Sequence, residues 1–335
     1  MRRFFIFFSY LIIALMVFYY YAASENSQFS EPYSLQSNSS LKDYSTGDTL
    51  TIVTYNIGYL SGMTNNLPME RSRSLFENNG KNAASLLNRI DPDIICYQEI
   101  DFQSKRSFSV NQFEQLTTAL KHTSTYSSIN WNKNYVPFPY WPLSAHFGGI
   151  VSGQAASSKF TFAQGQTIVF DKPDFAPFYY KDFYLDRLLQ IVDVKIGSDT
   201  LKVLNVHLEA FDKSTRVSQS IKLKIIADSI ANLYPTLLVG DFNSKPGYVD
   251  TTDGMAYLMQ SEKLESAISR EQYDRDTLSS FTFNTEDPYQ MIDYVLYGND
   301  FVKVIEARVL REAGEISDHY PVLVKFVLVP QNPNN

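Results

Sequence analysis

Residues 315–326 read EISDHYPVLVKF, and they join three polar side chains to a strand pattern. From 320 to 326, Tyr, Val, Val and Phe alternate with Pro, Leu and Lys, which predicts a strand packed into a sheet. Ser317, Asp318 and His319 stand directly before this strand, although such groups are costly to bury without partners. They therefore either end a loop or point toward a ligand.

Five other apolar runs have the same arrangement, in which a strand-like stretch ends in acid, amide or imidazole side chains. They are TLTIVTYNIG (49–58, with Asn56), DPDIICYQEID (91–101, with Gln98 and Glu99), LKVLNVHLEAF (201–211, with Asn205 and His207), TLLVGDFNSKP (236–246, with Asp241 and Asn243) and QMIDYVLYGND (290–300, with Asp293). Any one of these clusters is explained by an ordinary turn or helix cap. Six of them predict that the strand ends converge on one site.

Helix-like stretches separate these strands, which predicts an α/β protein. In the longest stretch, 214–234, five apolar residues fall on or near one predicted helix face: Val217, Ile221, Ile225, Ala227 and Ile230. Arg216 and Gln219 are expected to brace this helix, and His122 is expected at the surface.

The composition is that of an ordinary folded protein, with 44% hydrophobic and 19% charged residues among 335. A net charge of −7 argues against a broadly basic surface for nucleic acid. The single cysteine, Cys96, excludes an internal disulfide and cysteine-based zinc clusters.

The N-terminus carries Arg2 and Arg3 and then no charged residue from 4 to 23, which is long enough for a helix across a bilayer. An uncleaved membrane anchor would leave the rest of the chain outside the cytoplasm. A cleaved signal segment, followed by export, is the alternative, because residues 22–24 are small.

The remaining chain divides into three parts. Residues 24–48 are polar and serine-rich and predict a flexible tether, 49–330 predict one folded domain, and 331–335 predict a disordered tail. We expect a monomer, and no protein partner is implied.

Carboxylates and amides without clustered cysteine or histidine favour Mg²⁺, or Mn²⁺, over zinc. Asp241 and Asn243 alternate along one strand face and could orient a water and a phosphoryl oxygen. His319 could hold or transfer a proton with Asp293 as its carboxylate partner. The sequence has no Walker loop, G-x-S-x-G elbow or H-E-x-x-H motif, so metal-assisted hydrolysis of a phosphate ester remains.

The segments TYNIG, CYQEID, LNVHL, VGDFNSKP, MIDYVLY and SDHYPV, in this order, resemble the endonuclease/exonuclease/phosphatase superfamily over residues of about 50–328. The resemblance implies a DNase I-like, four-layer α/β sandwich with two mixed β-sheets packed face to face and helices outside. Here an N-terminal hydrophobic helix would be added to it.

The resemblance also implies roles for the motif residues. Glu99 would be the principal Mg²⁺ ligand, with Asn56 beside it and Asp318 completing the shell. Asp241 would orient or activate the attacking water, and Asn243 would hold the phosphate.

Four further residues are expected around the phosphate. His319 would contact it, braced by Asp293, and His207 would protonate the leaving oxygen or bind the phosphate. Arg187, on a strand that pairs with that of His207, and His146, in an aromatic-rich stretch, are candidate substrate contacts.

The substrate is left open between several classes. A phosphodiesterase acting outside the cytoplasm on nucleic acid or on a phospholipid head group is favoured. A phosphomonoesterase on inositol phosphates or lipids is the alternative, and a non-catalytic tethered binding domain is an alternative of another class. The aromatic segment 130–147 could enter a bilayer interface, stack on bases or fold inward.

Overall fold

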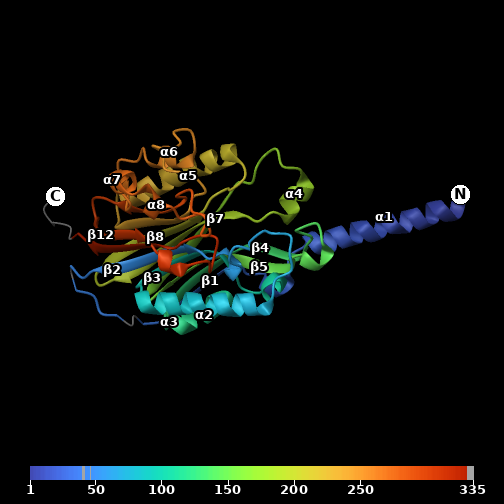
Figure 1. Cartoon of the computed structure of the whole chain (residues 1–335), viewed down its shortest axis with the longest axis horizontal. Coiled ribbons are helices and arrows are strands. Elements are labelled where there is room, and N and C mark those ends of the chain that lie inside the picture. The colour runs from blue at the N-terminus through green and yellow to red at the C-terminus, as the bar shows by residue number, and fades with distance from the viewer. Residues whose placement is uncertain (40–41, 46, 330–335) are drawn as a thin grey trace.

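The computed structural model describes residues 1–39, 42–45 and 47–329, in which two β-sheets pack face to face between two layers of helices (Figure 1). This is the four-layer α/β sandwich expected from the sequence. Each sheet is mixed, because β2 pairs with β3 and β8 with β9 in parallel, whereas the other pairs are antiparallel.

The first sheet has seven strands. In spatial order they are β1 (Tyr33–Ser37), β4 (Ser124–Val136), β5 (Gly148–Ser158), β3 (Ile94–Asp101), β2 (Leu50–Asn56), β13 (Val322–Leu328) and β12 (Val302–Val309). The second sheet has six: β10 (Leu264–Ser266), β11 (Asp293–Gly298), β9 (Thr236–Asp241), β8 (Asp199–His207), β7 (Arg187–Ile196) and β6 (Phe162–Phe170).

Helices cover the outer faces of both sheets (Figure 1). The first sheet is covered by α2 (Arg73–Ile90) and α3 (Gln112–Leu120), and the second by α5 (Lys213–Ala231), α6 (Gly254–Leu258), α7 (Arg270–Arg275) and α8 (Thr277–Ser280). The remaining helices are α1 (Arg2–Ala23) and the short α4 (Phe178–Phe183).

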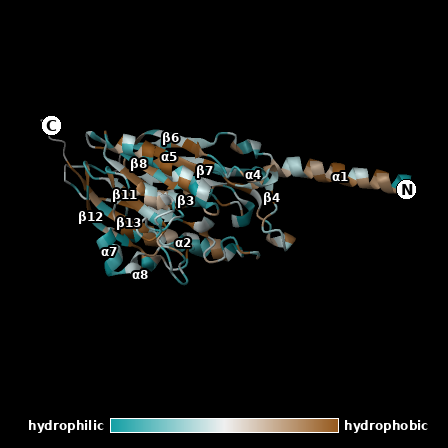
Figure 2. Ribbon diagram, turned by 90° about the horizontal axis from the view of Figure 1, so that it is seen from above, coloured by the Kyte–Doolittle hydropathy of each residue, from teal (hydrophilic) through white to brown (hydrophobic). Residues whose placement is uncertain are grey.

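The central strands are buried on both faces, as their long apolar runs predict. Ile52 and Ile94 face the second sheet and pack into one large core with Val203 and Leu238. Their chain neighbours point the other way, toward α2 and α3, and form a second core with Phe76, Leu87 and Leu116. Figure 2 shows hydrophobic colouring inside the sandwich and also along α1.

The buried face of α5 agrees only in part with the predicted one. Ala227 is buried as predicted, but Ile221 and Ile225 are exposed and Leu223 faces the sheet instead. Polar contacts at the start of the helix set this rotation, as the predicted bracing residues suggested. Arg216 pairs with Asp253 at 2.9 Å, and Gln219 accepts a hydrogen bond from the backbone N–H of Glu209 at 2.9 Å.

Two corrections concern residues expected to be free of the core. Residues 33–37, within the expected flexible tether 24–48, form β1 and pair with β4 at the sheet edge, because backbone hydrogen bonding to an open edge requires no apolar side chains. His122 is buried rather than at the surface, and its two ring nitrogens lie 2.8 Å from Ser157 Oγ and 3.1 Å from the Pro92 carbonyl. The expected tail, 331–335, lies outside the described residues.

Helix α1 extends away from the domain, and most of it is exposed (Figures 1 and 2). Its length and apolar composition are sufficient to cross a membrane, and a signal segment near the N-terminus would have the same properties.

Candidate active site

The motif residues converge at one edge of the sandwich. Asn56 and His207 end β2 and β8, and Asp241 ends β9, where it lies directly opposite both His207 and the first residue of β11, Asp293. The loop before β13 adds His319. Parallel strands deliver their C-terminal residues to the same sheet edge, so the topology alone accounts for much of this convergence.

His319 lies between two buried carboxylates. Its Nδ1 donates a hydrogen bond to Asp293 Oδ2 at 2.9 Å, and its Nε2 lies 3.8 Å from Asp241 Oδ2. Burial alone would lower the pKa of His319, but Asp293 and Asp241 outweigh that effect and raise the pKa well above its ordinary value. The imidazole is therefore cationic at neutral pH. Phe283 packs on the ring at a centroid distance of 4.9 Å and fixes its plane.

Asp241 is the carboxylate best suited to exchange a proton at neutral pH. Burial, and next the charge of Asp293, raise its pKa to about 7. Its two oxygens are held by the side chain of Asn56 and by the backbone N–H of Asn243, each at 2.9 Å. The carboxylate is thus oriented by neutral donors, with no lysine or arginine ion pair among the described residues.

His207 is held neutral beside this pair. Arg187 Nη1 donates to His207 Nε2 at 2.7 Å, so the ring proton is on Nδ1, which is buried without a hydrogen-bond partner among the described residues. Burial, and then the charges of Arg187 and His319, lower the pKa of His207 well below its ordinary value. Nε2 lies 3.5 Å from Asp241 Oδ2, so His207 and His319 flank the same carboxylate.

Arg187 is placed by two residues that the sequence did not single out. Tyr184 accepts a hydrogen bond from Arg187 Nη2 at 2.9 Å and donates one to Glu209 Oε1 at 2.8 Å. Glu209 follows His207 by two residues, which was the available signal for it. Nothing in the local pattern marks Tyr184, which comes from the segment after α4.

A second acidic group, beside His207 like the Asp241 pair, fits a divalent cation, and its Glu99 Oε1 lies 3.9 Å from His207 Nε2. Burial, and then the nearby Asp318, raise the pKa of Glu99. The amide of Asn65 donates to Glu99 at 3.0 Å and lies 3.3 Å from Asp318 Oδ2. Two carboxylates bridged only by an amide are the donor set that Mg²⁺ takes, with Asn56 at the neighbouring strand end. Asn65 is a site residue that the sequence did not reveal.

The backbone conformation around Glu99 and Asp318 helps to position their side chains. Glu99 sits in a register shift of β3 at a φ of +52°, which turns its side chain to the sheet edge. Gly58, at a φ of +50°, lies so close that an added Cβ would be 2.7 Å from Asp318 Oδ1. Asp241, Asp293 and His319 also have ligand atoms within 4.8 Å of one another and could hold an ion, but Asp293 and His319 are already hydrogen-bonded together.

The side chains of two residues predicted to contact the substrate form hydrogen bonds elsewhere in the protein. The side chain of Asn243, whose φ is +49°, donates to the Leu208 carbonyl at 3.0 Å, beside Asp241. His146 is hydrogen-bonded to the Tyr135 hydroxyl at 2.7 Å and lies 3.4 Å from the Tyr140 carbonyl, and it makes no hydrogen bond to Asp241, His207 or His319.

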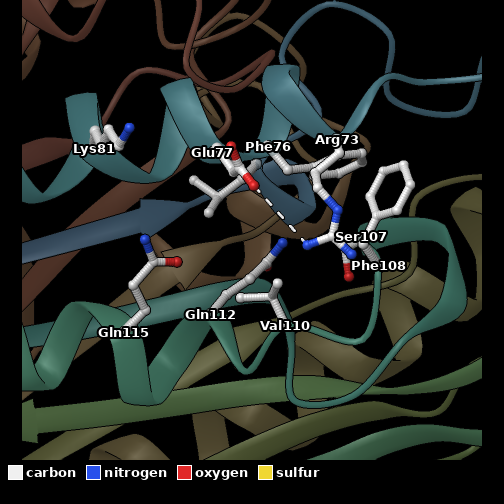
Figure 3. A pocket seen from close by; sticks show the side chains of 10 residues that line it. Arg73, Phe76, Glu77, Lys81, Ser107, Phe108, Val110, Gln112 and Gln115 are labelled. Atoms are coloured by element: carbon white, nitrogen blue, oxygen red, sulfur yellow. Dashed lines mark ion pairs between the residues drawn. The ribbon is translucent and has the colours of Figure 1, made fainter.

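A cavity of about 170 Å³ lies elsewhere, between α2 and the segment 105–115 (Figure 3). It is lined by Arg73, Glu77 and Lys81 on one side and Phe108 and Gln115 on the other, and Arg73 and Glu77 approach to 3.9 Å. It shares no residue with the candidate active site.

Comparisons with known proteins agree with this geometry. The sequence model of the endonuclease/exonuclease/phosphatase family matches residues 53–319. The fold is similar to that of an endonuclease/exonuclease/phosphatase from Beutenbergia cavernae DSM 12333, with a TM-score of 0.59, 17% identity, and coverage of 84% of this chain and 72% of that chain. No curated protein sequence matches the chain.

Two other similar structures carry functional names. The human Nocturnin catalytic domain with bound sulfate has a TM-score of 0.58 and 16% identity, and the match covers 91% of this chain and 100% of that one. D. rerio TDP2, complexed with a single-strand DNA product, has a TM-score of 0.57 and 14% identity, with coverage of 83% and 99%. At such identities the likeness concerns the fold.

Proposed function

The chain belongs to the endonuclease/exonuclease/phosphatase family, a family of phosphoric ester hydrolases, and on this premise we propose that it is a Mg²⁺-dependent phosphodiesterase, with Mn²⁺ as an alternative ion. The observation that carries the proposal is the convergence of Asp241, His319 and His207, a carboxylate flanked by a charged and a neutral imidazole. A binding domain without turnover would not need a carboxylate whose pKa is raised to about 7.

The proposed reaction adds water across one P–O ester bond. Asp241 takes a proton from the water as its oxygen bonds to phosphorus, while the bond to the leaving oxygen breaks. The cationic His319 is positioned to bind the negative phosphoryl oxygens through Nε2, because Nδ1 is engaged by Asp293.

Arg187 and His207 form the opposite wall of the site. Arg187 brings a second positive charge to the phosphate side, and the neutral His207 holds it there by accepting from its Nη1. The leaving oxygen takes its proton from solvent water. Asn243 would help to hold the phosphate from beside Asp241. His146 could contact only a more remote part of a substrate.

The metal would be held by Glu99 and Asp318, with Asn56 beside them, and it would supply positive charge against the phosphoryl oxygens. Asn65 would remain hydrogen-bonded to both carboxylates and hold them in place.

The proposal is tested by the release of p-nitrophenol from bis(p-nitrophenyl) phosphate with Mg²⁺, with Mn²⁺ and with EDTA. We expect turnover with either ion, none with EDTA, and turnover lowered about 10²-fold or more in Asp241→Asn. Turnover that persists in EDTA, or that stays near the wild-type rate in the variant, would contradict it. DNA, RNA, phospholipids and inositol phosphates then serve as substrates in the same assay.

We also propose that α1 remains uncleaved and anchors a monomeric catalytic domain on the outer side of a membrane. Support comes from the 22-residue helix, which carries no charge after its first two residues, Arg2 and Arg3. The protein should then resist extraction from membranes by high salt. A mature N-terminus at Ser24 in the native host would refute the anchor and indicate an exported enzyme.

A further inference from the structure

Exposed aromatic side chains gather where α1 joins the domain. The most exposed of them, which we call the aromatic surface, are Tyr140 (78%), Trp141 (74%), Phe175 (74%), Phe178 (70%), Tyr179 (58%) and Phe211 (78%). Phe178 and Tyr179 belong to α4, and the others come from the loop before α4 and from the loops that follow β4 and β8. Clustered exposed apolar side chains on a soluble domain mark a binding surface, because leaving them in water is unfavourable.

Direct contacts connect these segments. Tyr180 stacks on Tyr184 at a centroid distance of 4.9 Å, and Tyr184 lies 6.5 Å from Phe211. Trp131, on β4, donates from Nε1 to the carbonyl of Phe183 at the end of α4 at 2.8 Å, and β4 leads into the loop that carries Trp141. The aromatic residues therefore belong to one region.

The last turns of α1 pack against this region. The ring of Tyr19 lies 6.3 Å from Phe178 and 5.6 Å from Phe183, and the Tyr19 hydroxyl donates to Asp182. Phe18 lies 5.6 Å from Tyr135, on the strand that leads to Trp141. The membrane-spanning helix and the aromatic surface are thus neighbours.

The C-terminal end of α1 is hydrogen-bonded directly to the domain. Lys133 Nζ donates to the carbonyl of Ala23, the last residue of the helix, at 2.8 Å, and Asn134 N–H donates to the Ser24 carbonyl at 3.0 Å. Figure 1 shows α1 leaving directly beside α4 and β4. With α1 across a bilayer, its last turn lies at the interface, and the aromatic surface is held at the same level.

The same region touches the active site. Tyr184, which stacks on Tyr180, accepts a hydrogen bond from Arg187, and Arg187 donates to His207 at 2.7 Å. Phe211 is linked to the site through Glu209, which accepts from its backbone N–H at 3.0 Å. A phosphate bound by His207 and His319 would therefore lie near whatever the aromatic surface contacts.

The charge of this region indicates what kind of ligand or membrane surface it can contact. Residues 136–145 carry no acidic or basic side chain, and 171–187 carry four aspartates against Lys172, Lys181 and Arg187. Nucleic acids and anionic lipids are bound through an excess of lysine and arginine, which this region lacks. Tyrosine, tryptophan and phenylalanine are favoured at uncharged membrane interfaces, and aromatic faces attract quaternary ammonium groups.

We propose that the aromatic surface lies in the head-group layer of the membrane that holds α1, and that the substrate is a zwitterionic phospholipid whose phosphodiester is hydrolysed there. This inference rests on the proposed phosphodiesterase function. Water adds across one P–O bond of the head group, and an alcohol and a phosphomonoester are released.

The position of the surface is tested by fluorescence of the full-length protein in phosphatidylcholine vesicles. Its two tryptophans are Trp141, which is exposed, and Trp131, whose Nε1 donates to the Phe183 carbonyl at 2.8 Å. Lipids brominated near the head group should quench the wild type strongly and Trp141→Phe weakly, at low and at high salt. Equal quenching of both proteins would overturn the membrane contact, and so would quenching that salt abolishes.

The substrate class is tested by the activity of the same vesicles. A triple variant, Tyr140→Ser, Trp141→Ser and Phe175→Ser, should hydrolyse bis(p-nitrophenyl) phosphate normally but lose about tenfold or more of its activity on phosphatidylcholine, because less apolar area enters the interface. A matched control changes Leu233, Leu278 and Ile305, exposed by 65%, 68% and 54% on other elements, to Ser and should keep both activities.

The outcomes separate the two proposals. If the wild type hydrolyses the soluble diester but no phospholipid, or if the triple variant keeps full lipid activity, the lipid inference fails and the phosphodiesterase stands. If neither substrate is hydrolysed, the proposed function fails and the lipid substrate with it, while the quenching result still decides whether the surface enters the membrane.

Discussion

Two clusters of buried polar side chains lie between the sheets, and they differ in charge. The amide cluster consists of Gln98, Gln154, Gln190 and Asn205, and the acid–histidine cluster consists of Asp241, Asp293, His207 and His319. In the amide cluster every side-chain nitrogen donates to a protein oxygen, and Asn205 alone reaches three. It joins strands of both sheets.

Both clusters leave two buried atoms without a partner among the described residues: Gln98 Oε1 and Gln154 Oε1 in the amide cluster, and Asp293 Oδ1 and His207 Nδ1 in the acid–histidine cluster. Only the acid–histidine cluster places two carboxylates together, and the charge of Asp293 raises the pKa of Asp241. Buried like charges destabilise a fold unless an opposite charge or a ligand compensates them. The difference indicates that the amide cluster serves cohesion and the acid–histidine cluster serves chemistry, and four predictions test that division.

The largest effect is expected from Asp241→Asn. Loss of the group that takes the proton should lower kcat about 10²–10⁴-fold. Because one of two repelling buried acids is neutralised, the melting temperature should not fall. Turnover of bis(p-nitrophenyl) phosphate and calorimetry measure the two effects. A variant that loses activity only because it unfolds would place Asp241 among the cohesive groups.

Asp293→Asn and His319→Ala should each lower kcat by about 10²-fold, since both disturb one positioned imidazole. The double variant should be little worse than the poorer single variant, because the pair acts as a unit. Fully additive losses would show that the 2.9 Å hydrogen bond between them is not used in the reaction.

Asn205→Leu should act on stability instead. It leaves its amide partners in the core unsatisfied, which should reduce the free energy of unfolding by about 2 kcal/mol or more without changing kcat at a temperature where the variant is folded. Asn88→Leu, at an exposed amide of α2, is the matched control and should change neither. If Asn205→Leu lowered kcat without lowering the free energy of unfolding, the amide cluster would take part in the reaction, and the proposed division between the two clusters would be wrong.

The smallest effect is expected at His122, a buried histidine that contributes to the stability of the fold and not to the reaction. Burial lowers its pKa from 6.5 to about 4, so between these values the unfolded chain binds more protons and stability falls as the pH falls. Between pH 7 and 5 the wild type should lose about 2 kcal/mol more than His122→Gln. Denaturant unfolding at both pH values measures this, and parallel pH profiles would show that His122 is not held neutral.

The order and spacing of the six motifs predicted the sandwich and most of the acid–histidine cluster, because strand ends and their polar residues are local features. His207 and Asp241 end their strands and Asp293 begins one, while Glu99 lies two residues before the end of β3 and His319 three residues before β13. Local pattern could not separate Gln98 from Glu99. These neighbours point to opposite sides, and the shifted register at Glu99 turns one residue into the amide cluster and the other toward the site edge.

Tertiary structure decided the features that depend on what packs against a residue. The rotation of α5 was set by Asp253 and by the backbone of Glu209, and the burial of His122 by Pro92 and Ser157. Asn65 and Tyr184 reach the site from segments with no motif of their own. A sequence pattern records which face of an element is apolar, but the partners of a polar side chain come from distant segments, and only the folded chain brings them within hydrogen-bonding distance.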